Sequence, residues 1–74
     1  MSNDYRFNQV LAVYDKYDKE YNEAIDNLQH NLEACNFDMV IVYAEKCKHL
    51  RGIKMLLKFK LEIIDGERAK QISY

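Results

Sequence analysis

Proline is absent from this chain of 74 residues, and glycine occurs only twice, at Gly52 and Gly66. A β-rich domain of this size needs turn residues at intervals of about 8–12 positions, and the sequence lacks them. Long helices suit this composition, because proline and glycine are the residues that interrupt a helix most strongly. The sequence therefore predicts an all-α fold with very few loops.

The first half of the chain carries one long amphipathic pattern. Its apolar residues recur at alternating steps of three and four, which is the heptad spacing of packed helices. They are Phe7, Val10, Tyr14, Tyr17, Tyr21, Ala24 and Leu28. Ser2, Asn3 and Asp4 can cap the start, since their side-chain oxygens accept hydrogen bonds from free N–H groups. We therefore expect a helix over about residues 4–35.

The second half repeats the pattern after a turn at about residues 35–37. Asn36 tolerates left-handed geometry and also caps helices, so it can close one helix and open the next. Gly66 is a stop signal at the C′ position. We expect a second helix over about 37–65 and a short tail over 66–74, all within one helical domain, 1–74. The apolar positions are Val40, Tyr43, Cys47, Leu50, Leu57, Leu61 and Ile64, widened by Met39, Ile53, Leu56 and Ile63.

Charge is distributed unevenly between the two predicted helices. Residues 1–36 hold seven acids and three bases, a net charge of −4, whereas residues 37–74 hold five acids and eight bases, a net charge of +3. A hairpin folded about Asn36 places residue i opposite residue 72 − i. That register brings Asp18 near Lys54, Asp15 near Lys58 and Asp26 near Lys46. The charge pattern therefore favours a two-helix antiparallel hairpin.

Both apolar stripes are broader than one seam between two helices needs. A chain this short is near the margin of stability, and small scaffolds usually need a disulfide, a metal or oligomerisation. We therefore expect two hairpins to associate into a four-helix bundle. A dimer is the preferred state, with larger helical oligomers as the alternative.

Several function classes have no support in the sequence. No phosphate-binding loop or catalytic motif is present, and Cys35 and Cys47 do not form a secreted-type disulfide framework. No signal peptide and no apolar run long enough to span a membrane is visible. We therefore expect a cytoplasmic protein that is not an enzyme and has no cofactor, no metal site and no catalytic residue.

Tyrosines give the first candidate site. Tyr14, Tyr17 and Tyr21 stand inside the first stripe, and Tyr43 stands on the second helix. The preferred interpretation is a core or interface in which the rings pack. The alternative is a groove in which these rings and Arg51 hold a small anionic or nucleotide ligand.

A basic run gives the second candidate site. It comprises Lys46, Lys48, Arg51, Lys54, Lys58 and Lys60, with no acid between them. We prefer the interpretation that these bases complement the acidic first helix. The next alternative is a face that binds nucleic acid, RNA in particular, through Lys46, Lys48, Arg51, Lys54 and Lys58. A basic helix lying on a membrane is the least favoured, so no membrane partner is expected.

A third candidate site is an apolar patch on the second helix, away from the predicted seam. It consists of Ile41, Met55 and Phe59, with Gly52 on the same side. Large apolar side chains are frequent anchors of protein interfaces. We therefore expect a small non-catalytic interaction protein that binds and modulates or inhibits another macromolecule, a protein in preference to nucleic acid. The alternatives are an RNA-binding regulator and a ligand-holding bundle.

Overall fold

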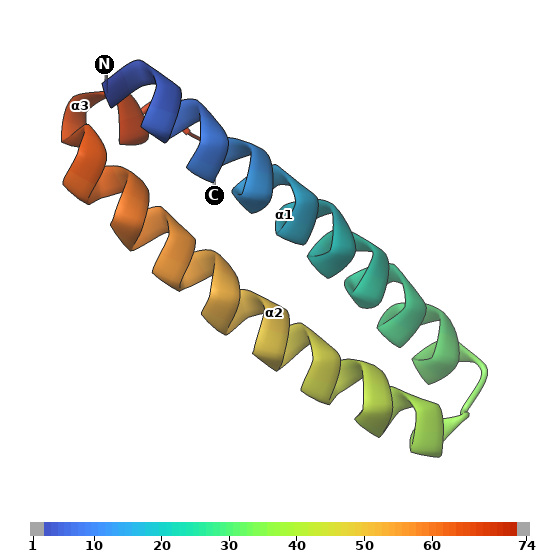
Figure 1. Cartoon of the computed structure of the whole chain (residues 1–74). Coiled ribbons are helices and arrows are strands. Elements are labelled where there is room, and N and C mark those ends of the chain that lie inside the picture. The colour runs from blue at the N-terminus through green and yellow to red at the C-terminus, as the bar shows by residue number, and fades with distance from the viewer. Residues whose placement is uncertain (1–2, 73–74) are drawn as a thin grey trace.

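A computed structural model describes residues 3–72 of the chain. Two long helices, α1 (Asn3–Glu33) and α2 (Phe37–Ile64), lie antiparallel, and a short third helix, α3 (Gly66–Ala69), closes the end where the chain begins (Figure 1). The hairpin measures 51 × 17 × 15 Å. The all-α fold and the helical hairpin are therefore confirmed.

The helices meet in the register that the charge pattern predicts. The ammonium Nζ of Lys54 lies 2.6 Å from Oδ1 of Asp18. The carboxylates of Asp15 and Asp26, which the same register places near Lys58 and Lys46, are exposed to solvent. The predicted register is therefore correct at the middle of the hairpin.

The core consists of two apolar clusters along the seam. One contains Phe7, Tyr14, Leu61 and Ala69 near the closed end, and the other contains Ala24, Cys47 and Leu50 nearer the turn. Tyr17 and Tyr21 are half-buried against the second cluster. On both helices the buried residues recur at steps of three and four. Each helix therefore covers the apolar stripe of the other, and this accounts for the packing of α1 against α2.

The turn differs in detail from the prediction. Cys35, and not Asn36, takes the left-handed conformation, with φ of 59°. The N–H of Asn36 donates to the carbonyl of Asn31 at 2.9 Å, and that of Cys35 donates to Leu32 at 3.1 Å. These two bonds form a Schellman motif with Cys35 at C′, so α1 ends two residues before its predicted end. Asn36 is the N-cap residue of α2, but its side chain makes no cap bond.

The end of α2 is set by Asp65 and not by Gly66. Asp65 has an extended backbone (φ −157°, ψ 94°), and its Oδ1 accepts a hydrogen bond from the N–H of Arg68 at 3.2 Å. An aspartate in this position caps a new helix, and Gly66 is the first residue of that helix. The first four residues of the predicted tail are therefore α3, which buries Ala69 in the Phe7 cluster.

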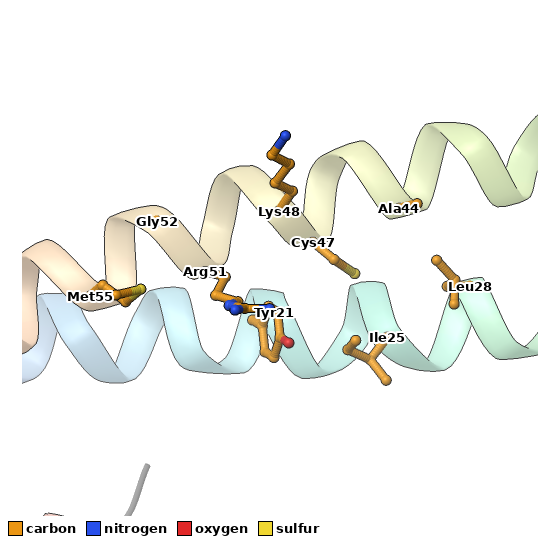
Figure 2. A pocket seen from close by; sticks show the side chains of 9 residues that line it. All are labelled: Tyr21, Ile25, Leu28, Ala44, Cys47, Lys48, Arg51, Gly52 and Met55. Atoms are coloured by element: carbon orange, nitrogen blue, oxygen red, sulfur yellow. The ribbon is translucent and has the colours of Figure 1, made fainter.

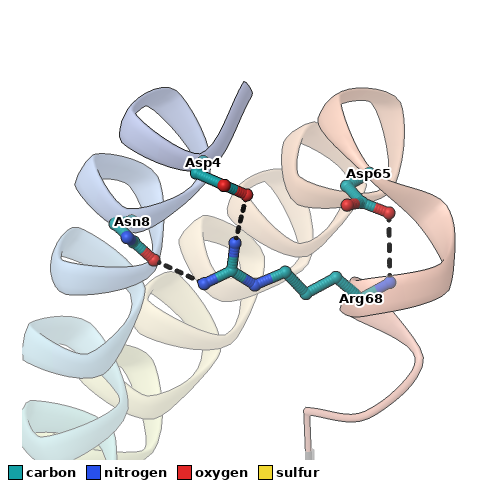
Figure 3. Close-up of polar contacts among 4 residues, drawn as sticks. All are labelled: Asp4, Asn8, Asp65 and Arg68. Carbon is teal, nitrogen blue, oxygen red and sulfur yellow. Dashed lines mark hydrogen bonds and ion pairs between the residues drawn. The ribbon is translucent and has the colours of Figure 1, made fainter. Parts of the chain in front are cut away.

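Arg68 ties α3 to the start of α1. One guanidinium nitrogen donates to Oδ1 of Asp4 at 2.9 Å, and another donates to Oδ1 of Asn8 at 2.8 Å (Figure 3). The guanidinium carbon also lies 4.5 Å from the centre of the Phe7 ring. Asp4 therefore lies in the first turn of α1 and binds Arg68, while Ser2, the other capping candidate besides Asn3, is outside the described residues.

Leu56 and Ile63, which widen the predicted apolar stripe of the second helix, lie outside the seam between the helices. Their side chains are 72% and 70% exposed. Both lie on the exposed side of α2, because their spacing from Leu50 and Leu57 takes them about 100–140° around the helix. None of the helices described here is long and apolar enough to cross a membrane.

Candidate functional site

An open groove runs between the helices on the half of the hairpin nearer the turn. Its volume is about 600 Å³. The lining is mostly apolar, with two bases at the rim: Tyr21, Ile25, Leu28, Ala44, Cys47, Lys48, Arg51, Gly52 and Met55. Arg51 extends from α2 toward Tyr21 of α1, while Lys48 points away from α1 (Figure 2). The groove is thus an apolar surface that α1 and α2 leave uncovered.

The tyrosines of the predicted ligand groove do not all come together. Tyr14, Tyr21 and Arg51 line one concavity of about 250 Å³, together with Lys54, Met55 and Lys58. Tyr17 and Tyr43 do not line it; both are half-buried elsewhere along the hairpin.

Lys54 already occupies the space between two of these rings. Its Nζ lies 4.5 Å from the centre of the Tyr21 ring and 5.7 Å from that of Tyr14. The same ammonium pairs with Asp18, and the Lys54 side chain is only 15% exposed. Its charge is therefore satisfied within the hairpin by an ion pair and by two ring faces.

The basic residues of α2 divide into two groups. Lys46, Lys48 and Arg51 are exposed, whereas Lys54 and Lys58 are half-buried. Since Lys54 is held by Asp18, the five residues proposed for nucleic acid do not form one continuous exposed stripe.

The apolar patch predicted on α2 is exposed and extends further than the sequence indicated. Met55 and Phe59 are 62% and 63% exposed, and Leu56 and Ile63 lie on the same side. Met55, Leu56 and Phe59 line a shallow depression beside Gly52. Ile41 is also exposed, but it precedes Met55 by 14 positions, or about 21 Å along the helix. Leu56 and Ile63 were missed, although the three-four spacing Gly52, Leu56, Phe59, Ile63 is visible in the sequence.

The two cysteines have different environments. Both are free thiols; Cys35 is exposed at the turn and Cys47 is buried in the seam. Burial raises the pKa of the Cys47 thiol above its ordinary value, and the charge of Lys46 offsets only part of this effect. A thiol with a raised pKa is a poor nucleophile. Within residues 3–72, no group of three or more His, Cys, Asp or Glu side chains is arranged to hold a metal ion.

Comparison with known proteins found no matching family model, no matching curated protein and no matching solved structure.

Proposed function

We propose that this chain is a small non-catalytic interaction protein, which binds another protein through the outer face of α2 and thereby modulates or inhibits it. The observation that carries the proposal is the exposed apolar surface around Met55 and Phe59. Soluble monomers rarely leave contiguous apolar patches of this kind uncovered unless a partner binds there.

We also propose that the chain acts as a homodimer, in which a second copy covers the open groove between the helices. The groove carries apolar side chains of Ile25, Leu28 and Met55 that one hairpin does not cover. If α1 of one copy lies over α2 of the other, the acidic half of the chain meets the basic half. Sedimentation equilibrium at micromolar concentration should give twice the 8.9 kDa mass of one chain. A single species of one chain mass would contradict the dimer.

Nucleic-acid binding is the second candidate, since Lys46, Lys48 and Arg51 are exposed on one helix. It ranks lower because Lys54 is engaged by Asp18. The ligand-holding bundle ranks lower still, because Lys54 covers the ring face of Tyr21 that a ligand needs.

Capture from a lysate of the source cells, with and without nuclease, separates the first two candidates. The variant Phe59→Ser, at a position outside the groove, should lose the captured partner, whereas Lys46→Gln/Lys48→Gln/Arg51→Gln should retain most of it. All four positions are exposed, so both variants should keep wild-type helicity. Loss of capture by the Gln variant alone, or on nuclease treatment, would instead support nucleic-acid binding through counterion release.

A further inference from the structure

The apolar groove between α1 and α2 continues to the turn of the hairpin. Residues seven positions apart lie on nearly the same side of a helix. Three large apolar residues stand seven positions from groove-lining residues (Ile25, Ala44 and Lys48, in the same order), and these are Leu32, Phe37 and Ile41. Their side chains are 51%, 60% and 59% exposed. We call the side of the hairpin that carries the groove and these three residues the groove face.

The half of the groove face nearer the closed end is charged. Three charged residues stand seven positions from other residues that line the groove, and these are Asp18, Lys58 and Glu62. Asp18 is paired with Lys54, but its side chain is still 39% exposed. Arg51 is exposed at the rim of the groove, at the boundary between the two halves. The groove face is thus apolar toward the turn and charged toward the closed end.

A second copy of the chain can cover the groove face in two symmetric ways. In the same-end arrangement, the two-fold axis runs parallel to the helices. Both turns then lie at one end, and α1 of each copy lies on α2 of the other. In the opposite-end arrangement, the axis crosses the helices. The turns then lie at opposite ends, and like helices face each other.

The division of the groove face along its length selects the same-end arrangement. There, the apolar half of one copy covers the apolar half of the other. In the opposite-end arrangement each apolar half covers the partner's charged half, and charged groups are costly to bury without a partner. Sliding the copies until only their apolar halves overlap avoids this cost, but it leaves about half of the face uncovered.

The charges of the two helices agree with this selection. In the hairpin, residue i of α1 lies level with residue 72 − i of α2, as the contact between Asp18 and Lys54 shows. A two-fold axis parallel to the helices keeps the same levels between copies. Arg51 of one copy then lies within one helical turn of Asp18 in the other, and Leu32 lies level with Ile41 of the other copy. Base therefore meets acid, and apolar side chain meets apolar side chain.

We infer that the chain forms a four-helix bundle in the same-end arrangement, in which the groove face of one hairpin covers that of the other. This inference rests on the proposed homodimer and specifies how its two copies are placed. Leu32 and Ile41 of each copy pack across the dimer at the turn end. Arg51 pairs across the dimer with the exposed part of the Asp18 carboxylate.

Cys35 reports which arrangement the dimer adopts, because its thiol is exposed at the turn. In the same-end arrangement the two Cys35 residues lie on either side of the dimer interface, about 10 Å apart, which is the usual spacing of packed helices. In the opposite-end arrangement with full overlap, nearly the whole length of the hairpin, 51 Å, separates them.

The test is chemical crosslinking of the native wild-type protein with a substoichiometric amount of a short bis-maleimide. Cys35 of one copy should become linked to Cys35 of the other, and mass spectrometry of the digest identifies the linked residues. Sedimentation equilibrium on the same sample gives the fraction of dimer. A dimer without the Cys35 link would overturn the inference and leave the proposed homodimer standing, whereas a monomer would reject both.

A thiol at the closed end provides the matched control. The variant Cys35→Ala/Lys70→Cys carries it at an exposed position. When this variant is mixed with wild type, the same-end arrangement should give no link between Cys35 and the thiol at position 70. The opposite-end arrangement brings these two ends together, so that link would overturn the inference.

Two further variants locate the interface. Leu32→Asp should weaken dimerisation by more than about thirtyfold and abolish the Cys35 link, because it would bury an unpaired charge. Leu32 is half exposed in the hairpin, so circular dichroism should show unchanged helicity. Val13→Asp is the control: Val13 is 43% exposed and lies about a third of a turn around α1 from Ile25, away from the groove face. Equal dimerisation of the two variants would show that the second copy does not lie on the groove face.

Discussion

Lys54 of α2 and Asp18 of α1 form an ion pair in the middle of the hairpin, with Nζ and Oδ1 2.6 Å apart. The pair lies between the two apolar clusters, and the lysine also lies over the Tyr21 ring. A helical hairpin with two similar apolar clusters can slide by one turn, because apolar contacts alone are not directional. A single buried or half-buried polar contact can fix the register, and we infer that this pair has that role.

Lys54→Gln should therefore lower the free energy of unfolding by about 1 kcal/mol, since it removes one partly exposed ion pair and a cation–π contact. Chemical denaturation monitored by circular dichroism measures the change. Lys60→Gln is the control, because Lys60 is exposed on the same helix, and it should alter stability by less than about 0.5 kcal/mol. Equal stabilities of the two variants would show that Lys54 does not contribute to holding the register.

The contact of Arg68 with α1 gives a second prediction. Arg68→Ala should lower the free energy of unfolding by about 1 kcal/mol, because it removes two hydrogen bonds and the contact with Phe7 at an exposed site. Hydrogen exchange should also become faster in the first turns of α1. Lys70→Ala is the control: its pairing with Glu67 is almost fully exposed. Unchanged exchange in α1 would contradict the role of Arg68 as a tie between the ends of the chain.

The left-handed residue at the turn gives a third prediction. Cys35 has φ of 59°, and a residue with a Cβ in this region costs roughly 1–2 kcal/mol more than glycine does. Cys35→Gly should therefore raise the melting temperature by about 4–8 °C. Cys35→Ala also removes the thiol but keeps the strain, so it should leave the melting temperature near that of the wild type. Equal changes in melting temperature for Cys35→Gly and Cys35→Ala would show that loss of the thiol, and not relief of the backbone strain, causes the change.

The main architecture was predictable because two independent signals agree. The three-four spacing from Phe7 to Leu28 predicts a long helix, and the opposite charges of the two halves select an antiparallel partner in the register that joins Asp18 to Lys54. The association of hairpins stays a prediction, since the structure contains one chain.

The closing of the hairpin by α3 was not predictable in the same way. Arg68 is 64 positions from Asp4 and 60 from Asn8, and no local pattern links residues so distant in sequence. Asp65 did carry a signal, because an aspartate that caps a helix can also end the preceding one. Glycine at C′ is the more familiar stop signal, so Gly66 was expected to end the second helix. In the structure Gly66 is instead the first residue of α3.

The full extent of the exposed apolar face was not predicted, because α2 is apolar on more than one side. Leu57 and Leu61 follow one three-four series, while Leu56 and Ile63 follow another that is rotated around the helix. Periodicity identifies both series but cannot say which one faces α1. Packing decides it: Leu61 is fully buried and Leu56 is 72% exposed.

The two thiols should react at very different rates. Cys35 is exposed, whereas Cys47 is buried and the pKa of its thiol is raised by desolvation. Maleimide at neutral pH should therefore label Cys35 rapidly and Cys47 only after denaturation, since the thiolate is the reactive form. Mass spectrometry of the digested protein measures the two sites separately. Rapid labelling of Cys47 in the native state would mean that the seam around Leu50 opens readily.

The raised pKa of Cys47 also predicts how stability depends on pH. Because the folded state holds the thiol proton more tightly than the unfolded state, this contribution is complete below the ordinary thiol pKa of about 8.5. It is then lost as the pH rises through the higher pKa of the folded state. The melting temperature of the wild type should therefore fall more steeply above about pH 8.5 than that of Cys47→Ala, in which no thiol ionises at this position. If melting temperature falls with pH equally steeply in the wild type and in Cys47→Ala, Cys47 ionises equally easily in the folded and unfolded chains. That result would contradict its burial against Ala24 and Leu50.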